Sequence, residues 1–179
     1  MKRGCEETFN LETLKRVYLS IGTNLGDRLA NINRALDLIK KIPAHIEKVS
    51  PIFENEPLGF ESPNLFYNLV LKIRTFFSPE ALFIELKKIE FSMGRKREST
   101  IGDRIIDLDI IFYEDLVMET SLLMIPHSKA TERAFVVLPL LYIEEDLIDP
   151  LSGKSLRQLA QERARFFEKQ GFKEKIVRP

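Results

Sequence analysis

The stretch IIDLDIIFY, residues 105–113, is the most apolar strand-like segment of the chain, and it carries two aspartates inside it. Asp is depleted from strands, whereas β-branched and aromatic residues favour them. In an extended strand Asp107 and Asp109 point to the same face, about 6.6 Å apart along the backbone. The alternate residues from Ile106 to Phe112 then fill the opposite face, and we expect them to pack in the core.

The segments before this strand alternate between strand-like and helix-like patterns. Asp27 can cap a helix whose apolar residues recur at helical spacing, and Ser78 followed by Pro79 is a typical helix start. Pro51 predicts an irregularity inside the second strand. In chain order we expect a strand at 16–21, a helix at 27–41, strands at 45–55 and 66–77, a helix at 78–93 and the strand at 105–113.

This order of elements is the split βαβ arrangement of ferredoxin-like folds, in which an antiparallel sheet carries both helices on one face. After a hairpin near 114–115, the remainder should add a strand and two helices, the last over about 152–168. We therefore predict an α+β fold: a ferredoxin-like antiparallel sheet core extended by extra strands, with helices packed around it in an α-β-α arrangement.

Composition limits the classes of protein to consider. Lys+Arg and Asp+Glu both number 27, so the net charge is zero, which argues against a dedicated nucleic-acid binder. The single cysteine, Cys5, fits a reducing compartment. No signal-peptide core is present at the start, and no apolar run approaches the length of about 18 residues that a membrane span needs. We expect a cytoplasmic protein that does not bind membranes.

A chain of 179 residues with 44% hydrophobic residues can form one compact domain. Residues 1–15 are a polar N-terminal extension, 16–164 are expected to form the single domain, and 165–179 are a basic C-terminal tail.

The aspartate pair is a candidate metal site. Two like charges this close repel each other, and a cation between them removes the repulsion. Hard carboxylate oxygens suit Mg²⁺, which commonly takes one or two carboxylates together with substrate phosphates. The alternative is a strand with one wet face that carries two acids, because the D-x-D pattern alone has little specificity.

Basic residues concentrate just before this strand, with Arg95, Arg97 and Arg104 inside ten residues. Arginine suits phosphate oxygens because its planar fork donates two hydrogen bonds at once. Carboxylates for a metal beside arginines for phosphates are typical of phosphoryl transfer. The alternative is a solvated basic loop paired with its own acidic residues. A polar loop of this length can also act as a lid.

Two further motifs each allow a functional and a structural interpretation. His127, with Arg133 and Phe135 just beyond it, is either a donor to a phosphate or ribose or an ordinary surface histidine. Residues 22–26, GTNLG, are neither a Walker A nor a G-x-G-x-x-G motif. A tight turn that needs two glycines, with Asn24 bonded to neighbouring backbone, is the favoured interpretation of this segment.

Taken in order, these pieces resemble the 6-hydroxymethyl-7,8-dihydropterin pyrophosphokinase family of folate biosynthesis. The resemblance extends over about residues 16–160 and keeps the spacing between motifs. The matching pieces are SIGTNLGD (20–27), EPLG (56–59), FYN (66–68), GRKR (94–97), GDRIIDLDI (102–110), PH (126–127) and RAF (133–135).

The resemblance implies an enzyme that transfers the terminal diphosphate of ATP to the hydroxymethyl oxygen of the pterin and releases AMP. Two Mg²⁺ ions are expected as cofactors, with ATP as co-substrate, and association with another folate enzyme is a possible partnership. The residues that match catalytic positions are Asp107, Asp109, Arg95 and Arg104, of which the two aspartates would hold the metal. By the same analogy Asp107 lies near the attacking hydroxyl and is expected to help take its proton.

The resemblance also divides the remaining site residues between the two substrates. Phe66 and Phe135 match aromatics that sandwich the pterin, and Asn68 matches the side chain that reads its edge. The positions matching the ATP site are Glu90, Arg95, Arg97, Arg104, Ile110, His127 and Arg133. The positions matching the pterin site are Glu56, Pro57, Leu58, Phe66, Asn68, Asp107 and Phe135.

Four positions depart from the commonest family pattern: Ile101 stands where the lid has a tryptophan, Asp103 replaces a proline, Ser128 replaces a tyrosine, and Phe66 is often a tyrosine. These changes bear on lid contacts and nucleotide affinity and leave the aspartate pair intact. Two rival functions remain at this level. A nucleotidyltransferase would use the same two acids but release pyrophosphate, and a ferredoxin-like RNA-binding module would carry an aromatic signature that is absent.

Overall fold

The structure is a computed structural model, and it describes residues 13–95, 102–171 and the backbone of 173–174. In chain order the elements are β1 (Lys15–Thr23), α1 (Arg28–Ile39), β2 (Ala44–Val49), β3 (Phe53–Asn55), β4 (Phe66–Thr75), α2 (Pro79–Ser92), β5 (Asp107–Tyr113), β6 (Met118–Glu119), β7 (Met124–Ile125), α3 (Ala134–Ile143), α4 (Leu156–Glu162), α5 (Ala164–Glu168) and β8 (Lys173–Glu174).

The main sheet has the order β5-β1-β4-β3-β8, and β2 also pairs with β4. All of its pairings are antiparallel. The predicted α+β fold with an antiparallel core and extra strands is therefore confirmed. The two long helices begin at the predicted caps, because Asp27 accepts from Ala30 N–H and Ser78 accepts from Ala81 N–H.

The strand expected over 45–55 is two strands. It breaks between Val49 and Phe53, where Pro51 can donate no ladder hydrogen bond. Ser50 bridges the break by accepting from Val70 N–H and donating its own N–H to Val70 O, both at 2.9 Å. β2 and β3 thus lie along the same partner strand, and β3 is aligned with the β4 end that starts at Phe66.

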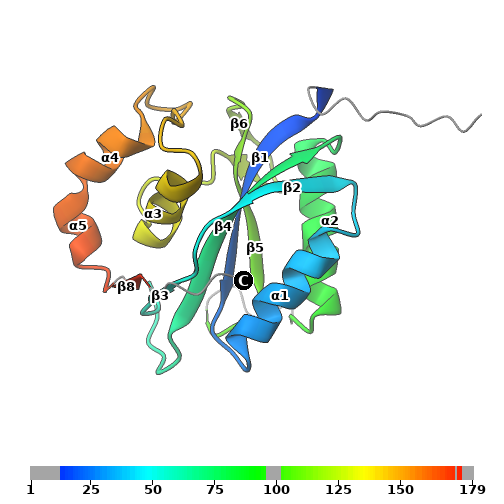
Figure 1. Cartoon of the computed structure of the whole chain (residues 1–179), viewed down its shortest axis with the longest axis horizontal. Helices are drawn as coiled ribbons and strands as arrows, with labels where there is room; N and C mark the ends of the chain where they lie inside the picture. Colours follow the sequence, from blue (N-terminus) through cyan, green and yellow to red (C-terminus); the bar gives the residue numbers. More distant parts are fainter. Residues whose placement is uncertain (1–12, 96–101, 172, 175–179) are drawn as a thin grey trace, which may run out of the picture.

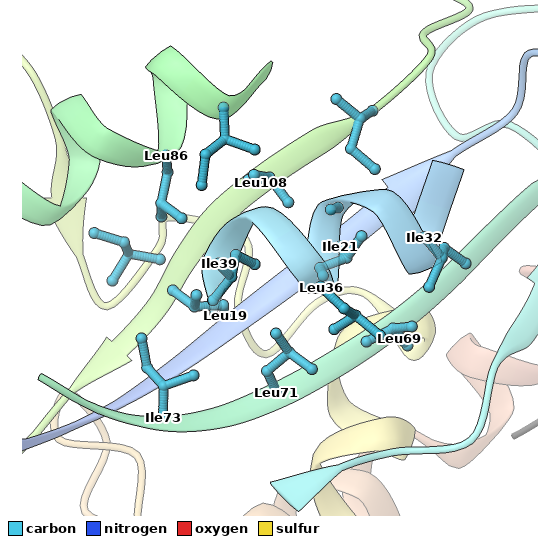
Figure 2. Packing of buried hydrophobic residues seen from close by; sticks show 14 of the residues in the cluster. Leu19, Ile21, Ile32, Leu36, Ile39, Leu69, Leu71, Ile73, Leu86 and Leu108 are labelled. Atoms are coloured by element: carbon cyan, nitrogen blue, oxygen red, sulfur yellow. The ribbon is translucent and has the colours of Figure 1, made fainter. Parts of the chain in front are cut away.

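Helices cover both faces of the sheet. α1 and α2 lie on one side, and α3, α4 and α5 lie on the other (Figure 1). The larger core cluster joins alternate residues of the central strands to α1 and α2, and Figure 2 shows it around Leu19, Leu71 and Leu108. A second cluster packs α3 and α4 against Tyr18, Val70 and Phe112. The chain therefore forms the expected α-β-α layers.

Phe112 does not lie on the face predicted for it. The β1–β5 register shifts so that Leu19 pairs with Ile110 while Tyr18 pairs with Phe112, which leaves Ile111 as an extra residue. This β-bulge breaks the two-residue alternation, so Phe112 turns to the α3 side and makes an edge-on ring contact with Tyr18 at 6.3 Å. Strict alternation over 105–113 was therefore a wrong expectation beyond Ile110.

The C-terminal third differs most from the expectation. One strand was expected there, but β6 and β7 pair in a small sheet of their own, and β8 joins the main sheet. The helix expected over 152–168 is two helices, α4 and α5, and it begins only after the Ser155 cap. Asp149 holds a turn by accepting from the N–H groups of Leu151 and Ser152, which delays the helix start. Within the described ranges, no helix is both long and apolar enough to cross a bilayer.

Candidate active site

An open cleft of about 580 Å³ lies where one end of β1, β4 and β5 meets the start of α3. Its lining combines carboxylates and arginines with aromatic and amide side chains. The residues that line it are Ser20, Gly22, Asn55, Leu58, Phe60, Phe66, Asn68, Arg104, Asp107, Asp109, Ile111, Arg133, Phe135 and Val136.

The two aspartates enter the cleft from β5, beside the central strand β1. Asp107 is paired with Gly22 and Asp109 with Ser20, so both carboxylates lie on the cleft side as predicted. Asp107 accepts from Arg95 on one oxygen and from Arg104 on the other. Burial would raise the pKa of Asp107, but the charges of Arg95 and Arg104 outweigh it and hold the pKa below its usual range. The carboxylate is therefore ionised at neutral pH.

Helix α2 supports this strand from the core side. Glu90 is 3% exposed and accepts from Leu108 N–H, between the two aspartates, at 2.7 Å. Its other partners are Arg95, at 2.8 Å, and Lys87, at 2.8 Å. Burial raises the pKa of Glu90, which the two cations only partly offset. Glu90 thus fixes the backbone that carries the acid pair.

Lys87 adds a positive charge beside Asp109. Its ammonium group donates to Leu108 O at 3.1 Å and lies 3.6 Å from Asp109 Oδ1. Nothing in the sequence marked Lys87 as a site residue, because a lysine on a helix is ordinarily solvated. The helical spacing of Lys87 and Glu90 places both at the same point of β5.

The amide half of the cleft lies across β1 from Asp107. Asn68 is paired with Gly22 on β1, so Gly22 separates Asn68 from Asp107. Asn68 is 3% exposed and donates to Asn55 Oδ1 at 2.6 Å, while Asn55 donates to Glu56 O at 2.7 Å. This series of hydrogen bonds fixes the orientation of the Asn68 amide.

Gly22 is required here because the Asn68 side chain lies against its backbone, and not because the chain turns at this position. A Cβ added to Gly22 would lie 2.7 Å from Asn68 Oδ1. Only Gly26 of the GTNLG segment has a positive φ, at 64°, and Gly22 lies inside β1. The prediction of a turn with two glycines was therefore wrong for Gly22, whose missing side chain leaves room for the cleft floor.

Aromatic rings form the walls of the cleft. Phe66 and Phe60 meet edge-on with ring centres 6.2 Å apart. Phe135 enters the cleft from the first turn of α3. Arg104 lies over the Phe66 ring at 5.8 Å, and Arg133 over the Phe135 ring at 5.5 Å. Phe66 and Phe135 thus each have an arginine guanidinium group over the ring.

Asp103 joins two loops at the cleft entrance. It accepts from the side-chain amides of Asn24 and Asn64, each at 2.6 Å. Asn24 also accepts from Arg104 N–H at 2.7 Å, so the loop after β1 is tied to the start of β5. The bonds of Asn24 are long-range, which corrects the expectation that it would bond to neighbouring backbone. A hydrogen bond from Ser62, followed by those from the two asparagines, lowers the pKa of Asp103.

His127 follows a cis peptide bond before Pro126 and lies half-buried. Its backbone N–H donates to the carbonyl of Ile111, the extra residue of the β5 bulge, at 3.0 Å. Burial lowers the pKa of His127, so the imidazole is neutral at pH 7. Nδ1 accepts from Lys129 N–H at 3.1 Å, which leaves Nε2 as the protonated donor.

The remaining predicted site residues lie outside the lining or outside the described residues. Glu56 and Pro57 precede Leu58 at the rim, and Ile110 packs in the larger core cluster. Arg97 and the central part of the expected lid, residues 96–101, are not among the described residues.

Several lining residues were missed by sequence reasoning. Phe60 adjoins the EPLG segment and Val136 follows Phe135, so proximity to matched motifs could have indicated both. Ser20 begins the SIGTNLGD segment, Asn55 precedes EPLG and Ile111 follows GDRIIDLDI, so the same proximity could have indicated these three. Strand register and the bulge then bring them together at the cleft.

The carboxylates of the cleft can be assessed as ligands for a divalent cation. Within the described residues, no group of three His, Cys, Asp or Glu side chains converges as a complete metal cage. Two carboxylates on one strand face fit Mg²⁺, which leaves its other positions to water and phosphate oxygens. Asp107 and Asp109 therefore suit a site that substrate phosphates complete.

An antiparallel α+β sheet with paired carboxylates and arginines at the ends of its central strands is an architecture suited to enzymes that act on phosphate esters. The profile of the family described as 7,8-dihydro-6-hydroxymethylpterin-pyrophosphokinase (HPPK) matches residues 18–145. A 2-amino-4-hydroxy-6-hydroxymethyldihydropteridine pyrophosphokinase of Aquifex aeolicus is 40% identical over 146 residues, which are 82% of this chain and 91% of that protein. The chain therefore belongs to the HPPK family.

Two longer proteins contain a similar region. The folic acid synthesis protein fol1 of Pneumocystis carinii is 39% identical over 153 residues, which are 86% of this chain but 20% of that protein. Among solved structures, an HPPK-DHPS chain in complex with substrates aligns with a TM-score of 0.73 and 16% identity, covering 90% of this chain and 46% of that chain. This structural likeness supports the fold, and the chain spans less than half of the HPPK-DHPS chain.

Proposed function

We propose that this chain transfers the diphosphate group of ATP to 6-hydroxymethyl-7,8-dihydropterin, giving the pterin diphosphate and AMP, in folate biosynthesis. The observation that carries the proposal is the register of three strands. Asn68, Gly22 and Asp107 stand side by side on β4, β1 and β5. An amide that can read a pterin edge thus lies two strand spacings, about 10 Å, from the carboxylate that faces the phosphate groups.

The pterin is held by the amide and aromatic half of the cleft. Asn68 offers a paired donor and acceptor, and its orientation is set by Asn55. Phe66 and Phe135 provide faces against which a flat heteroaromatic ring can pack. The hydroxymethyl group of the pterin then points across Gly22 towards Asp107.

ATP is held by the cationic half. Arg95 and Arg104 bind its phosphate oxygens, Arg133 contacts the phosphates or ribose, and His127 donates from Nε2. Arg95 donates to one oxygen of Asp107 and Arg104 to the other. The phosphates compete for these arginines, and this exchange releases the Asp107 carboxylate as ATP binds. Arg97 and Ile110 are further candidates on the nucleotide side.

Asp107 and Asp109 hold Mg²⁺, with two ions expected, and the metal supplies charge neutralisation along the triphosphate. The attacking hydroxyl oxygen forms a bond to the β-phosphorus, and the bond from that phosphorus to the oxygen shared with the α-phosphate breaks. The shared oxygen leaves with AMP. We propose that the Asp107 carboxylate, once its arginines have turned to the phosphates, orients the hydroxyl and helps to take its proton.

The proposed activity and the sequence also suggest where the protein acts and with which partner. An ATP-consuming enzyme with a single cysteine fits a reducing cytoplasm. Because similar regions occur within longer folate-synthesis proteins, we propose that this chain associates with another enzyme of folate synthesis.

Product analysis tests the proposal against the rival nucleotidyltransferase. The chain is incubated with ATP, Mg²⁺ and 6-hydroxymethyl-7,8-dihydropterin, and the nucleotides are separated by chromatography. AMP should appear in equal amount to the pterin consumed. Release of free pyrophosphate with an adenylylated pterin would establish the rival, and formation of ADP would contradict both.

A further inference from the structure

The start of α3 carries two cleft residues, Arg133 and Phe135, but it lacks a cap of its own. Arg133 occupies the N-cap position and makes no side-chain capping bond. Helix N-termini leave N–H groups without partners, and Ser, Thr, Asp or Asn at the N-cap normally satisfies one of them. This helix start must therefore be held from elsewhere.

Gln170 supplies the missing acceptor from the C-terminal segment. Its Oε1 accepts from Ala134 N–H, the first residue of α3, at 2.9 Å. Its Nε2 donates to Glu132 O, on the other side of Arg133, at 2.8 Å. The side chain is 9% exposed, so both bonds are made away from water. The Gln170 side-chain amide is thus hydrogen-bonded to the backbone on both sides of Arg133.

Two further residues of the C-terminal segment also hold the start of α3. Arg163 donates to Thr131 O at 2.7 Å, which holds the same loop one residue earlier. Phe167 of α5 packs with Ala134 and Val137 of α3 in a small buried cluster. In Figure 1, α5 lies beside α3 and leads back to the sheet at β8.

The same segment also reaches the other wall of the cleft. β8 pairs with β3, where Phe53 is matched with Glu174 and Glu54 with Lys173. A Cβ added to Gly171 would lie 3.5 Å from the Glu56 side chain, which begins the loop to Leu58. Residues 163–171 and 173–174 therefore contact both the α3 wall and the β3 wall, and they lie beyond the part of the chain that the family model matches.

We propose that Gln170 is a positioning residue, and that residues 163–171, together with β8, are a brace that sets the spacing between the two cleft walls. It touches no substrate. It holds Arg133 and Phe135 where they meet ATP and the pterin, opposite the loop from Glu56 to Phe60. The segment predicted as a separate C-terminal tail is, on this view, part of the site's framework. The kinetic consequences rest on the proposed function.

The test compares Gln170→Met, which keeps the size but loses both hydrogen bonds, with Gln170→Glu, which keeps the acceptor for Ala134 N–H. Gln161→Met, at an exposed glutamine of α4, is the matched control. Two quantities are measured on the full chain: backbone hydrogen exchange over 131–137 without ligand, and KM and kcat for both substrates.

Q170M should exchange at least about tenfold faster over 131–137 and raise both KM values about fivefold to tenfold, with kcat within about twofold of wild type. Q170E should recover only part of the loss, because it keeps the acceptor for Ala134 N–H but loses the donor to Glu132 O, and Q161M should match wild type. A merely structural role would lower the folded fraction and the apparent kcat while leaving KM unchanged. Wild-type KM in Q170M would overturn the inference, as would unchanged exchange. If the wild-type chain made no pterin diphosphate, the proposed function would fail, and the exchange result would still decide whether Gln170 braces α3.

Discussion

Asp107 and Asp109 lie on one face of one strand, but their surroundings give them different energetic roles. Asp107 is bonded to two arginines whose side chains are 16% and 13% exposed. Asp109 has Lys87 at 3.6 Å and a more exposed side chain, at 29%. From the sequence, removing either carboxylate was expected to relieve repulsion. The arginines reverse that expectation for Asp107.

The first prediction concerns these two carboxylates. Asp107→Ala and Asp109→Ala should each lower turnover by at least about 100-fold, because each removes charge stabilisation of the transferring group. Asp107→Ala should also destabilise the fold by about 1–3 kcal/mol, since it leaves the half-buried Arg104 without its carboxylate partner and Arg95 with Glu90 alone. Asp109→Ala should stay within about 0.5 kcal/mol of wild type. Urea unfolding and turnover, measured on both variants, check this, and equal stabilities would contradict the asymmetry.

Gly22 provides a second prediction at the scale of one atom. Gly22→Ala should leave the backbone unstrained but push the Asn68 amide from its place, because the new Cβ would lie 2.7 Å from Asn68 Oδ1. The KM for the pterin should rise about tenfold, the equivalent of about one hydrogen bond, with little change in the KM for ATP. Steady-state kinetics with each substrate varied in turn measure both constants. An equal rise in the two would mean that Gly22 does not separate the two halves of the site.

His127 provides a third prediction, through pH. Its pKa is lowered in the folded state by burial, so the unfolded chain binds more protons than the folded chain below the ordinary value of 6.5. Stability from this residue is therefore complete above about pH 6.5 and is lost as the pH falls towards the folded pKa, by at most about 1.4 kcal/mol per pH unit. His127→Asn should lose less stability than wild type between pH 7.5 and pH 5.5 in urea unfolding. A steeper loss in the variant would contradict the neutral, buried imidazole.

At the scale of elements, the sequence predicted those parts that local chemistry determines. Asp27 and Ser78 cap α1 and α2 as expected, and the order of strands and helices through β5 was predicted correctly except that the strand expected over 45–55 is two strands, β2 and β3. The bulge at Ile111 could not be predicted, because an extra residue in a strand leaves no mark in the periodicity of that strand. The start of α4 was missed because the Asp149 turn competes with the helix.

Loops that meet at the cleft entrance give the fourth prediction. Asp103 accepts from Asn24 on one oxygen and from Asn64 on the other. In Asp103→Asn, one of the two donors must face the new NH₂ group, and in Asn64→Asp two carboxylates face each other. Each single variant should raise the KM for the pterin about fivefold, because the loop that carries Leu58 and Phe60 loses its anchor.

The double variant D103N/N64D restores one donor for each acceptor and keeps the charge, so it provides a matched control. It should recover most of the pterin KM, with a coupling of about 1–2 kcal/mol between the two positions. Asp115→Asn, at an exposed acid after β5, should behave as wild type. A double variant no better than the singles would mean that this contact does not hold the loop.

At the scale of the whole molecule, the site is assembled from five parts of the chain that no local pattern connects. The acid pair and the arginines were accessible to sequence reasoning because their residue types stand out in an apolar strand and a polar loop. Resemblance to the family indicated Phe66, Asn68 and Phe135, and without it the two phenylalanines would have been assigned to the core. Lys87 and Gln170 act through contacts with distant backbone, so only the folded chain reveals them.

The central claim is that one cleft holds the pterin across Gly22 from a triphosphate and joins them at the β-phosphorus. The most direct measurement uses ATP labelled with ³²P in the β-phosphate, and follows the label in a single turnover with 6-hydroxymethyl-7,8-dihydropterin and Mg²⁺. The account predicts that all transferred label appears in the pterin product and that the released nucleotide is unlabelled AMP. Label that remained on the nucleotide as ADP, or that appeared as free pyrophosphate, would contradict it.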